Sequence, residues 1–329
     1  MRAALAAFFA LCFIAAPAAA QTGLTGADAV FAALDAQDHA QARALAEPLA
    51  AKGDARAQVA LGRIYERGLG VRPDIGMALE HYSAAAAAGD ADAQLALGRI
   101  AYEGGVYPDY ERAAGWFRLA SAGGDARADV ELGRMFADGR GVRRDPVAAA
   151  HHFAKAAAKN NGDGLFFLGL AFLRGDGVPL NLPNAEKYFA AAAAQGHAEA
   201  AFHLALMHDG TALGRANPAE AARLMRIAAE GGYAPAYAAM GLIVHRGDAE
   251  GTAADWFERG AKAGDAQAAL LYAVALSKGD GRPKDIAGAA EIARRLALAA
   301  ETPAPIRAQA GRLQQTLARQ ISGPITLRE

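Results

Sequence analysis

The feature that most constrains this chain is a repeat of about 36 residues. A Gly or Asn stands eight residues before a large apolar residue at seven places: Gly53 and Leu61, Gly89 and Leu97, Gly124 and Leu132, Asn160 and Leu168, Gly196 and Leu204, Gly232 and Met240, and Gly264 and Tyr272. The successive steps are 36, 35, 36, 36, 36 and 32 residues. A period of this length is typical of a supersecondary unit that buries its apolar face only by stacking on copies of itself.

Each copy contains two helical stretches separated by a glycine-containing loop. In the third copy we expect a first helix over Ala126–Ala137 that ends at Gly139, because glycine adopts the left-handed conformation that closes a helix. A second helix is predicted to begin at Asp145-Pro146, where Asp accepts backbone N–H groups and Pro suits the first helical position. The repeat is therefore predicted to be a helix pair.

The second stretch of a copy places Ala three or four residues before a large aromatic residue. Examples are Ala78 with Tyr82, Ala113 with Trp116 and Phe117, Ala149 with Phe153, Ala185 with Tyr188 and Phe189, and Ala253 with Trp256 and Phe257. Such spacing puts these side chains on one helix face. The first stretch usually has Gly directly after its large apolar residue, as in Leu97-Gly98. We expect that glycine to let the two helices approach closely, and the aromatic to fill the space between one pair and the next.

This pattern resembles the Sel-one-like repeat family, a relative of tetratricopeptide repeats. The resemblance implies an all-α, right-handed α/α superhelical solenoid of about seven helix-pair repeats, with capping helices at both ends. The expected repeats are 53–88, 89–123, 124–159, 160–195, 196–231, 232–263 and 264–300. Copy two is one residue short, and copy six lacks four residues near Asp248. Some family members carry a disulfide in each repeat, which this chain does not.

Composition agrees with a helical fold and excludes some functions. The chain is 53% hydrophobic, much of it Ala, and only 7% aromatic. Ala is the best helix former, and its small side chain allows close helix packing. With 34 basic and 35 acidic residues the net charge is -1, so nothing indicates a nucleic-acid surface.

The N-terminus reads as a targeting segment. Arg2 precedes an apolar stretch from Leu5 to Ala16, and small residues at Ala18–Ala20 fit signal-peptidase cleavage before Gln21. We expect residues 1–20 to be a signal peptide and the mature protein to be periplasmic. An uncleaved membrane anchor is the alternative, although the apolar stretch is shorter than the roughly 20 residues of a span. Cys12 is the only cysteine, so cleavage would leave no thiol or disulfide.

The two ends of the array are predicted to be caps. Residues 21–52 are expected to form an N-terminal cap with helices over Ala27–Leu34 and His39–Ala51. Pro303 and Pro305 are expected to end the last repeat, with a closing helix over Ile306–Gln320 inside a C-terminal cap, 301–321. Residues 322–329 are expected to be a disordered tail.

We find no convincing catalytic, cofactor or metal motif. His151 and His152 are adjacent, so they point to different helix faces, and His152 occupies the packing position of Trp116. His203 and His208 are five residues apart and lack the ligand spacings expected for zinc. No serine lies in a Gly-x-Ser-x-Gly motif. We therefore predict no enzyme activity, no cofactor and no metal.

A partner surface is suggested by one position of the first helices. In the related tetratricopeptide fold, the position two residues after the Leu of Leu-Gly faces the concave side, where it would line a groove. Here that position holds Arg63, Arg99 and Arg134, followed by Leu170, Leu206 and Leu242, with Glu66 and Tyr102 one turn onward. Such a groove would suit an extended peptide with an acidic portion, since Arg binds carboxylates well. Alternatively, the arginines are solvated or paired with acids such as Glu66 or Asp138, and the leucines are buried between repeats.

The resemblance implies protein–protein interaction, and we expect a scaffold or adaptor of the bacterial cell envelope. A second hypothesis is a hydrolase of β-lactams or peptidoglycan, an activity attributed to disulfide-rich relatives. A third is a glycan-binding module, which would need exposed aromatic residues along one groove. The sequence does not identify the partner.

Overall fold

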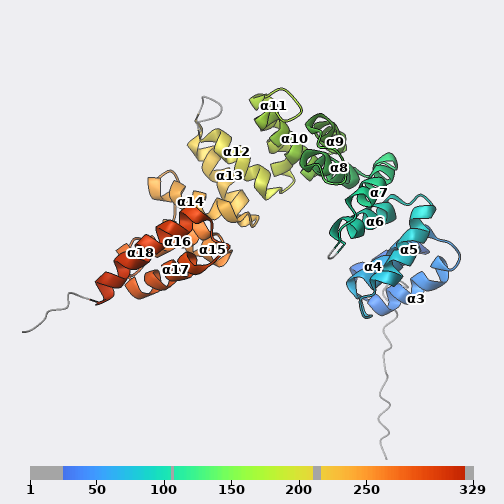
Figure 1. Ribbon diagram of the computed structural model, residues 1–329, viewed down its shortest axis with the longest axis horizontal. Coiled ribbons are helices and arrows are strands. Elements are labelled where there is room, and N and C mark those ends of the chain that lie inside the picture. The colour runs from blue at the N-terminus through green and yellow to red at the C-terminus, as the bar shows by residue number, and fades with distance from the viewer. Residues whose placement is uncertain (1–24, 105–106, 210–215, 323–329) are drawn as a thin grey trace, which may run out of the picture. The chain divides into compact units, whose positions relative to one another are not determined.

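The computed structural model describes residues 25–104, 107–209 and 216–322, and these residues form 17 helices and no strand (Figure 1). The expected signal peptide and most of the expected disordered tail lie outside the described residues. The chain divides into two compact units, Met1–Arg144 (unit 1) and Asp145–Glu329 (unit 2). Each unit is described by itself.

Each unit is built from consecutive helices that pack against one another. Unit 1 contains α2 (Ala27–Asp35), α3 (His39–Ala50), α4 (Ala55–Arg67), α5 (Ile75–Ala87), α6 (Ala91–Glu103), α7 (Tyr110–Ala122) and α8 (Ala126–Asp138). Unit 2 contains α9 (Pro146–Ala158), α10 (Gly162–Arg174), α11 (Leu182–Ala194), α12 (Ala198–His208), α13 (Pro218–Glu230), α14 (Ala234–Arg246), α15 (Ala253–Lys262), α16 (Ala266–Lys278), α17 (Ile286–Leu298) and α18 (Ala304–Ser322). From α4 to α17, even numbers mark the first helix of a pair and odd numbers the second. The predicted all-α helical solenoid is confirmed.

Side chains and glycines define the helix ends as the sequence predicted. In the third copy, Asp125 caps α8 and Asp145 caps α9 by accepting backbone N–H groups. The helix α8 ends at Gly139, which has a φ of 73° and is therefore left-handed. The residue that opens each copy is also left-handed, with a φ of 86° at Gly89 and 57° at Asn160. Asn tolerates this conformation better than other non-glycine residues, which explains its presence there.

A glycine on the first helix and an aromatic ring on the second helix join the two members of a pair. A Cβ added to Gly98 of α6 would lie 2.5 Å from Cδ1 of Phe117 on α7. The ring of Phe117 also shares a core cluster with Ala128 and Leu132 of the next pair. The aromatic therefore fills space within its own pair as well as between pairs, and the prediction named only the second contact.

Two copies show that the glycine and the ring depend on each other. The fifth and seventh copies carry Ala205 and Ala273 in place of the glycine, and both alanines are buried. Twenty residues later, where copies one, three and four have their ring, they have Met225 and Ala293. A flexible or small side chain leaves room for the extra methyl group that a rigid ring excludes.

The terminal helices largely follow the prediction. Helices α2 and α3 form an irregular pair whose Val30 and Ala46 are buried against α4. Helix α18 packs on α17 and buries Ala310 and Leu317. It begins at Ala304, two residues earlier than predicted, so Pro305 lies in its first turn and does not precede it. Proline is tolerated there because the first N–H groups of a helix have no intrahelical partner.

Candidate partner-binding surface

The predicted arginines lie at matching positions on three first helices of unit 1. We call Arg63 on α4, Arg99 on α6 and Arg134 on α8 the arginine column. Their side chains are 35%, 49% and 50% exposed, respectively. All three guanidinium groups are therefore accessible to solvent.

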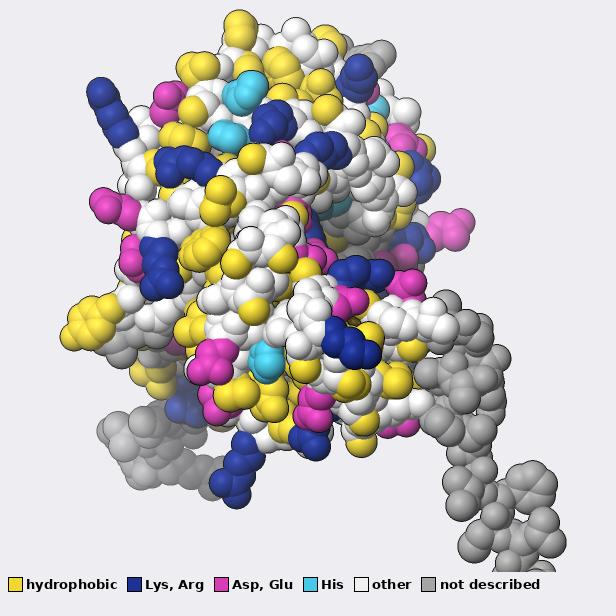
Figure 2. All heavy atoms as spheres, turned by 90° about the vertical axis from the view of Figure 1, so that its right-hand side faces the viewer, with side chains coloured by type: hydrophobic (Ala, Val, Ile, Leu, Met, Phe, Trp, Pro, Cys, Tyr) yellow, Lys and Arg dark blue, Asp and Glu magenta, His cyan; other side chains and the backbone are white. Residues whose placement is uncertain are grey.

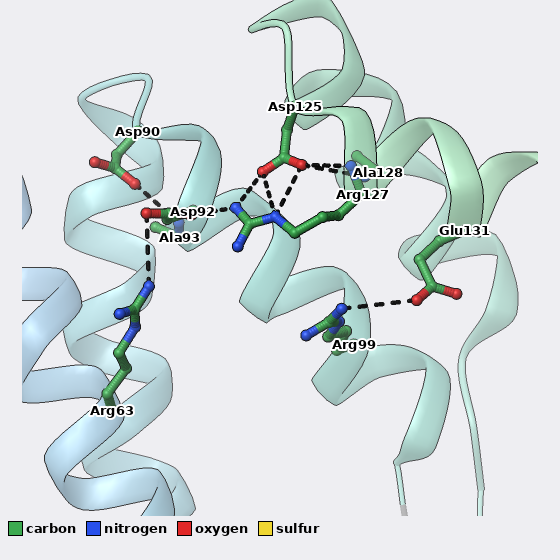
Figure 3. Close-up of polar contacts among 9 residues, drawn as sticks. All are labelled: Arg63, Asp90, Asp92, Ala93, Arg99, Asp125, Arg127, Ala128 and Glu131. Atoms are coloured by element: carbon green, nitrogen blue, oxygen red, sulfur yellow. Dashed lines mark hydrogen bonds and ion pairs between the residues drawn. The ribbon is translucent and has the colours of Figure 1, made fainter. Parts of the chain in front are cut away.

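Each arginine of the column is close to a carboxylate on a first helix, and Figure 3 shows the contacts of Arg63 and Arg99. The Nη2 atom of Arg63 lies 3.5 Å from Oδ2 of Asp92. Glu131 is shared by Arg99, at 3.8 Å, and Arg134, at 3.4 Å. The alternative of internal pairing thus holds, but the acids are neither Glu66 nor Asp138. These contacts are long for ion pairs and leave most of the guanidinium N–H donors unused.

A second charged position lies seven residues before the column, two turns earlier on the same helix face. It holds Arg56 on α4, Asp92 on α6 and Arg127 on α8, so its charge alternates along unit 1. Arg56 pairs with Asp28 of α2 at 2.7 Å, and Arg127 pairs with Asp92. Sequence reasoning missed this position, although its alternating sign at the repeat spacing was a detectable signal.

Arg127 links α6 and α8 through two carboxylates. It pairs with Asp92 and with Asp125, the residue that caps α8 (Figure 3). These bonds raise the pKa of Arg127 above its usual range despite some desolvation. Burial pushes the pKa of Asp125 upward, but the hydrogen bonds from Arg127 outweigh burial and the net pKa is lowered. Arg127 and Asp125 are therefore both ionised over the physiological pH range.

A pocket of about 310 Å³ opens beside the arginine column. Its lining consists of Phe31, Arg56, Val59, Arg63, Asp90 and Asp92. The guanidinium carbons of Arg56 and Arg63 lie 5.2 Å and 5.5 Å from the centre of the Phe31 ring, within the range of cation–π attraction. The pocket lining therefore combines an aromatic ring with two cations and two acids.

The two residues predicted to flank the column are engaged elsewhere. Glu66 accepts a hydrogen bond of 2.7 Å from the hydroxyl of Tyr82, and burial together with this bond raises the pKa of Tyr82 well above its usual range. The hydroxyl of Tyr102 accepts a hydrogen bond of 2.8 Å from Arg140, and its ring packs edge-on against Tyr110. Neither bond involves the arginine column.

The predicted leucines lie on three first helices of unit 2, and we call them the leucine column. Leu170 on α10 is half-buried and packs against the core. Leu206 on α12 and Leu242 on α14 are 41% and 43% exposed. The alternative hypothesis, that the leucines are buried between repeats, therefore holds in part for Leu170. It does not hold for Leu206 and Leu242, which present apolar surface to solvent.

The histidines singled out in the sequence have packing or hydrogen-bonding partners. His203 stacks on Phe189, with ring centres 5.4 Å apart. Burial, followed by the charges of Arg174 and His197, lowers the pKa of His203. His208 lies 3.6 Å from Glu186. The rings of His151 and His152 meet edge-on. Within the described residues there is no group of three or more His, Cys, Asp or Glu side chains able to hold a metal ion.

Sequence reasoning also missed the role of His197. Its Nδ1 atom accepts the N–H of Ala200 and so caps α12, where most other first helices use Asp or Asn. Its Nε2 atom lies 3.3 Å from Asp163. The signal in the sequence was that His197 stands directly before a predicted helix, at the position of a capping residue.

Charges of both signs are mixed on the visible face of the molecule in Figure 2. On the face shown in Figure 2, basic and acidic side chains alternate with hydrophobic ones, without a large area of one sign. Such a surface does not favour non-specific binding to nucleic acid. No helix in the described ranges is both long and apolar enough to cross a membrane.

Seven copies of the Sel1 repeat are recognised by the family profile at residues 55–90, 91–125, 126–161, 162–197, 198–233, 234–265 and 266–300. The chain belongs to the Sel1 repeat family. Each matched range begins two residues after the Gly or Asn that opens the corresponding copy in the sequence. No curated protein sequence matches the chain.

A solved structure shows the same fold. A Sel1 repeat protein from Oxalobacter formigenes is 24% identical, with a TM-score of 0.65 over 71% of this chain and 96% of the other. A protective antigen of uropathogenic Escherichia coli with an SLR fold is also 24% identical, with a TM-score of 0.45 over 85% of this chain and 76% of the other. Proteins of Sel1 repeats generally mediate protein–protein interactions, and the fold generally serves as a non-enzymatic scaffold.

Proposed function

We propose that this Sel1 repeat protein is an exported scaffold or adaptor of the bacterial cell envelope. It binds a partner protein or extended peptide on its first helices, through the arginine column in unit 1 and the leucine column in unit 2. The family supports protein binding in general.

We choose this surface because two carboxylates, Asp92 and Glu131, each contact two arginines. Glu131 serves both Arg99 and Arg134, and Asp92 serves both Arg63 and Arg127. A guanidinium has five N–H donors, so each arginine of the column has donors to spare. Exposed ion pairs are worth only about 0–1 kcal/mol, so a partner's carboxylate can replace the internal contact at little cost.

The leucine column supplies the apolar part of the proposed surface. Burying the exposed parts of Leu206 and Leu242 under a partner would be favourable, at about 25 cal/mol per Å² of apolar surface. Acidic residues Asp163 and Glu199 lie seven residues before Leu170 and Leu206, where unit 1 has its alternating charges. We expect the partner segment for unit 2 to be apolar, and that for unit 1 to be acidic.

Site-specific photo-crosslinking in cells tests the surface. A photoreactive residue at Arg99 or Leu206 should form an adduct with a partner. The same residue at Arg118 on α7 or Ala190 on α11, both exposed on second helices, should not. Adducts at all four positions or only on the second helices would contradict the assignment.

A charge test separates the arginine column from general electrostatics. The triple variant Arg63→Gln, Arg99→Gln, Arg134→Gln should lose the partner that the unmodified chain captures, or capture much less of it. A control with the same change in charge, Arg72→Gln, Arg118→Gln, Arg143→Gln, alters exposed arginines of unit 1 outside the column and should keep it. Equal loss in both variants would refute a specific role for the column.

Export is tested independently of binding. Cell fractionation and the mass of the purified protein should show a periplasmic chain that begins at Gln21. A full-length chain in the membrane fraction would support the uncleaved anchor, and a full-length chain in the cytoplasm would refute export.

A further inference from the structure

Two arginines from successive second helices lie over one indole ring in unit 2. The guanidinium carbon of Arg226 on α13 is 5.8 Å from the ring centre of Trp256 on α15. That of Arg259, one turn further along α15, is 4.4 Å from the same ring. Arg259 also lies 5.6 Å from the ring centre of Tyr237 on α14. Three helices therefore contribute to one cluster of cations and aromatic rings.

Local packing holds this cluster in place. Trp256 is only 7% exposed, so its ring is fixed in the core while both arginines remain exposed. Arg259 follows Trp256 by three residues and therefore shares its helix face. Gly260 allows α15 to approach α14 closely, because a Cβ at this position would lie 2.7 Å from Cβ of Tyr237. This close approach brings Arg259 over the tyrosine ring.

Among the residues that the structure describes, neither arginine of the cluster, Arg226 or Arg259, lies within ion-pair distance of an acid. The acids nearest in sequence to Arg259 are already engaged, since Asp255 and Glu258 both pair with Arg282. Elsewhere on α13, Arg223 is neutralised by Glu220 at 2.6 Å. Arg226 and Arg259 thus place two like charges over the same indole.

Stacking on an aromatic ring leaves the donors of a guanidinium available. Arg259, at 4.4 Å from the ring centre, is within stacking distance of the indole, and a stacked guanidinium keeps its five N–H donors in its own plane, where they point away from the ring. Planar guanidinium groups bind oxyanions through paired hydrogen bonds that are stronger than those between neutral groups. Cation–π attraction to a buried ring restricts the side chain of Arg259 and, more weakly at 5.8 Å, that of Arg226, which lowers the ordering cost of binding.

We propose that Arg226 and Arg259, seated on Trp256, form a binding site for a phosphate or sulfate group. A doubly charged tetrahedral oxyanion neutralises both cations and has enough oxygens for donors arriving from two helices. A single carboxylate would neutralise only one. The site includes no residue of the arginine or leucine columns, so it is independent of the proposed partner surface.

The chain's tryptophan content allows a direct test. There are two tryptophans, Trp116 and Trp256, so a Trp116→Phe background leaves Trp256 as the only indole. Inorganic phosphate and sulfate are titrated separately into this protein, with sodium chloride at equal ionic strength as the reference. Either oxyanion should change the fluorescence of Trp256 saturably, and chloride should not. The order of phosphate and sulfate affinities identifies the preferred group.

Variants assign the binding to the two arginines. Because their removal can itself alter the fluorescence, equilibrium dialysis with labelled phosphate or sulfate provides a second readout. Arg226→Gln and Arg259→Gln should each weaken binding about tenfold, as expected for the loss of a charge-assisted hydrogen bond. The control Arg223→Gln removes a nearby guanidinium of the same helix and should leave the dissociation constant within about twofold, since surface charge alone contributes little.

Three results would overturn the proposal. The first is the absence of saturable binding beyond the chloride reference. The second is equal weakening by Arg223→Gln, which would indicate only a general effect of charge. The third is unchanged binding in both glutamine variants, with their helical circular dichroism preserved.

Discussion

The contact between Gly98 and Phe117 gives the sharpest test of how a repeat holds together. In Gly98→Ala, the new Cβ would lie 2.5 Å from a carbon of the buried Phe117 ring. Carbon atoms normally rest about 3.5–4.0 Å apart, so the ring or the helix must move by more than about 1 Å. Overpacking of this kind typically costs about 1–3 kcal/mol.

Helix propensity acts in the opposite direction and must be separated from the clash. Replacing Gly by Ala inside a helix is favourable by about 0.5–1 kcal/mol. Gly115 lies in the middle of α7, and a Cβ added there meets nothing within 4 Å. Gly115→Ala therefore reports the propensity gain alone. The difference between the two variants isolates the clash, and we expect it to be about 1–3 kcal/mol.

Denaturant unfolding followed by circular dichroism measures this difference. We expect Gly98→Ala to unfold at lower denaturant than the wild type, and Gly115→Ala at equal or higher denaturant. Adding Phe117→Met to Gly98→Ala copies the Ala205 and Met225 combination of the fifth copy and should recover part of the loss. Equal midpoints for the two alanine variants, or no recovery by methionine, would refute the reasoning.

Three further predictions concern charged and capping residues. Burial lowers the pKa of His203, so the unfolded chain protonates this imidazole at a higher pH than the folded chain. The free energy of unfolding should therefore fall as the pH drops through about 6.5. His203→Phe should reduce the difference between the unfolding midpoints at pH 7.5 and 5.5. Unchanged pH dependence would contradict this. Burial raises the pKa of the capping residue Asp265, whereas hydrogen bonds from Arg127 outweigh burial and lower the pKa of Asp125. In thermal unfolding at pH 7, Asp265→Asn should therefore be neutral or stabilising, and Asp125→Asn should be destabilising. The reverse order would be inconsistent with these environments. Loss of the cap in His197→Ala should cost about 1 kcal/mol, and His197→Asn should restore most of it; identical unfolding midpoints for these two variants would exclude a capping role.

Local sequence signals predicted the helices and the repeat well. The third copy's first helix was expected over Ala126–Ala137 and extends to Asp138, and its second helix begins at Pro146 as expected. These boundaries depend on residues close in sequence, such as the Asp145 cap and the left-handed Gly139. The start of α18 differs from the prediction because Pro305 lies in the first turn of the helix, where proline is tolerated, and does not end the preceding segment.

The candidate surface was predicted only in outline. The sequence identified the positions of the arginine column, but not that Glu131 accepts both Arg99 and Arg134. It likewise gave no sign that Arg226 and Arg259 share one indole. An acidic residue 28 or 35 positions away, as in Arg56 with Asp28 or Arg127 with Asp92, is one of many possible partners until the helices are stacked.

By itself, the amino-acid sequence determined the repeat period, the helical class and the helix ends, because these follow from propensities and capping bonds between near neighbours. Only the tertiary structure decided which charges pair, which leucines remain exposed and which ring rests on which glycine. Those outcomes depend on packing between residues far apart in the chain, where a difference of about 1 Å separates a contact from a clash.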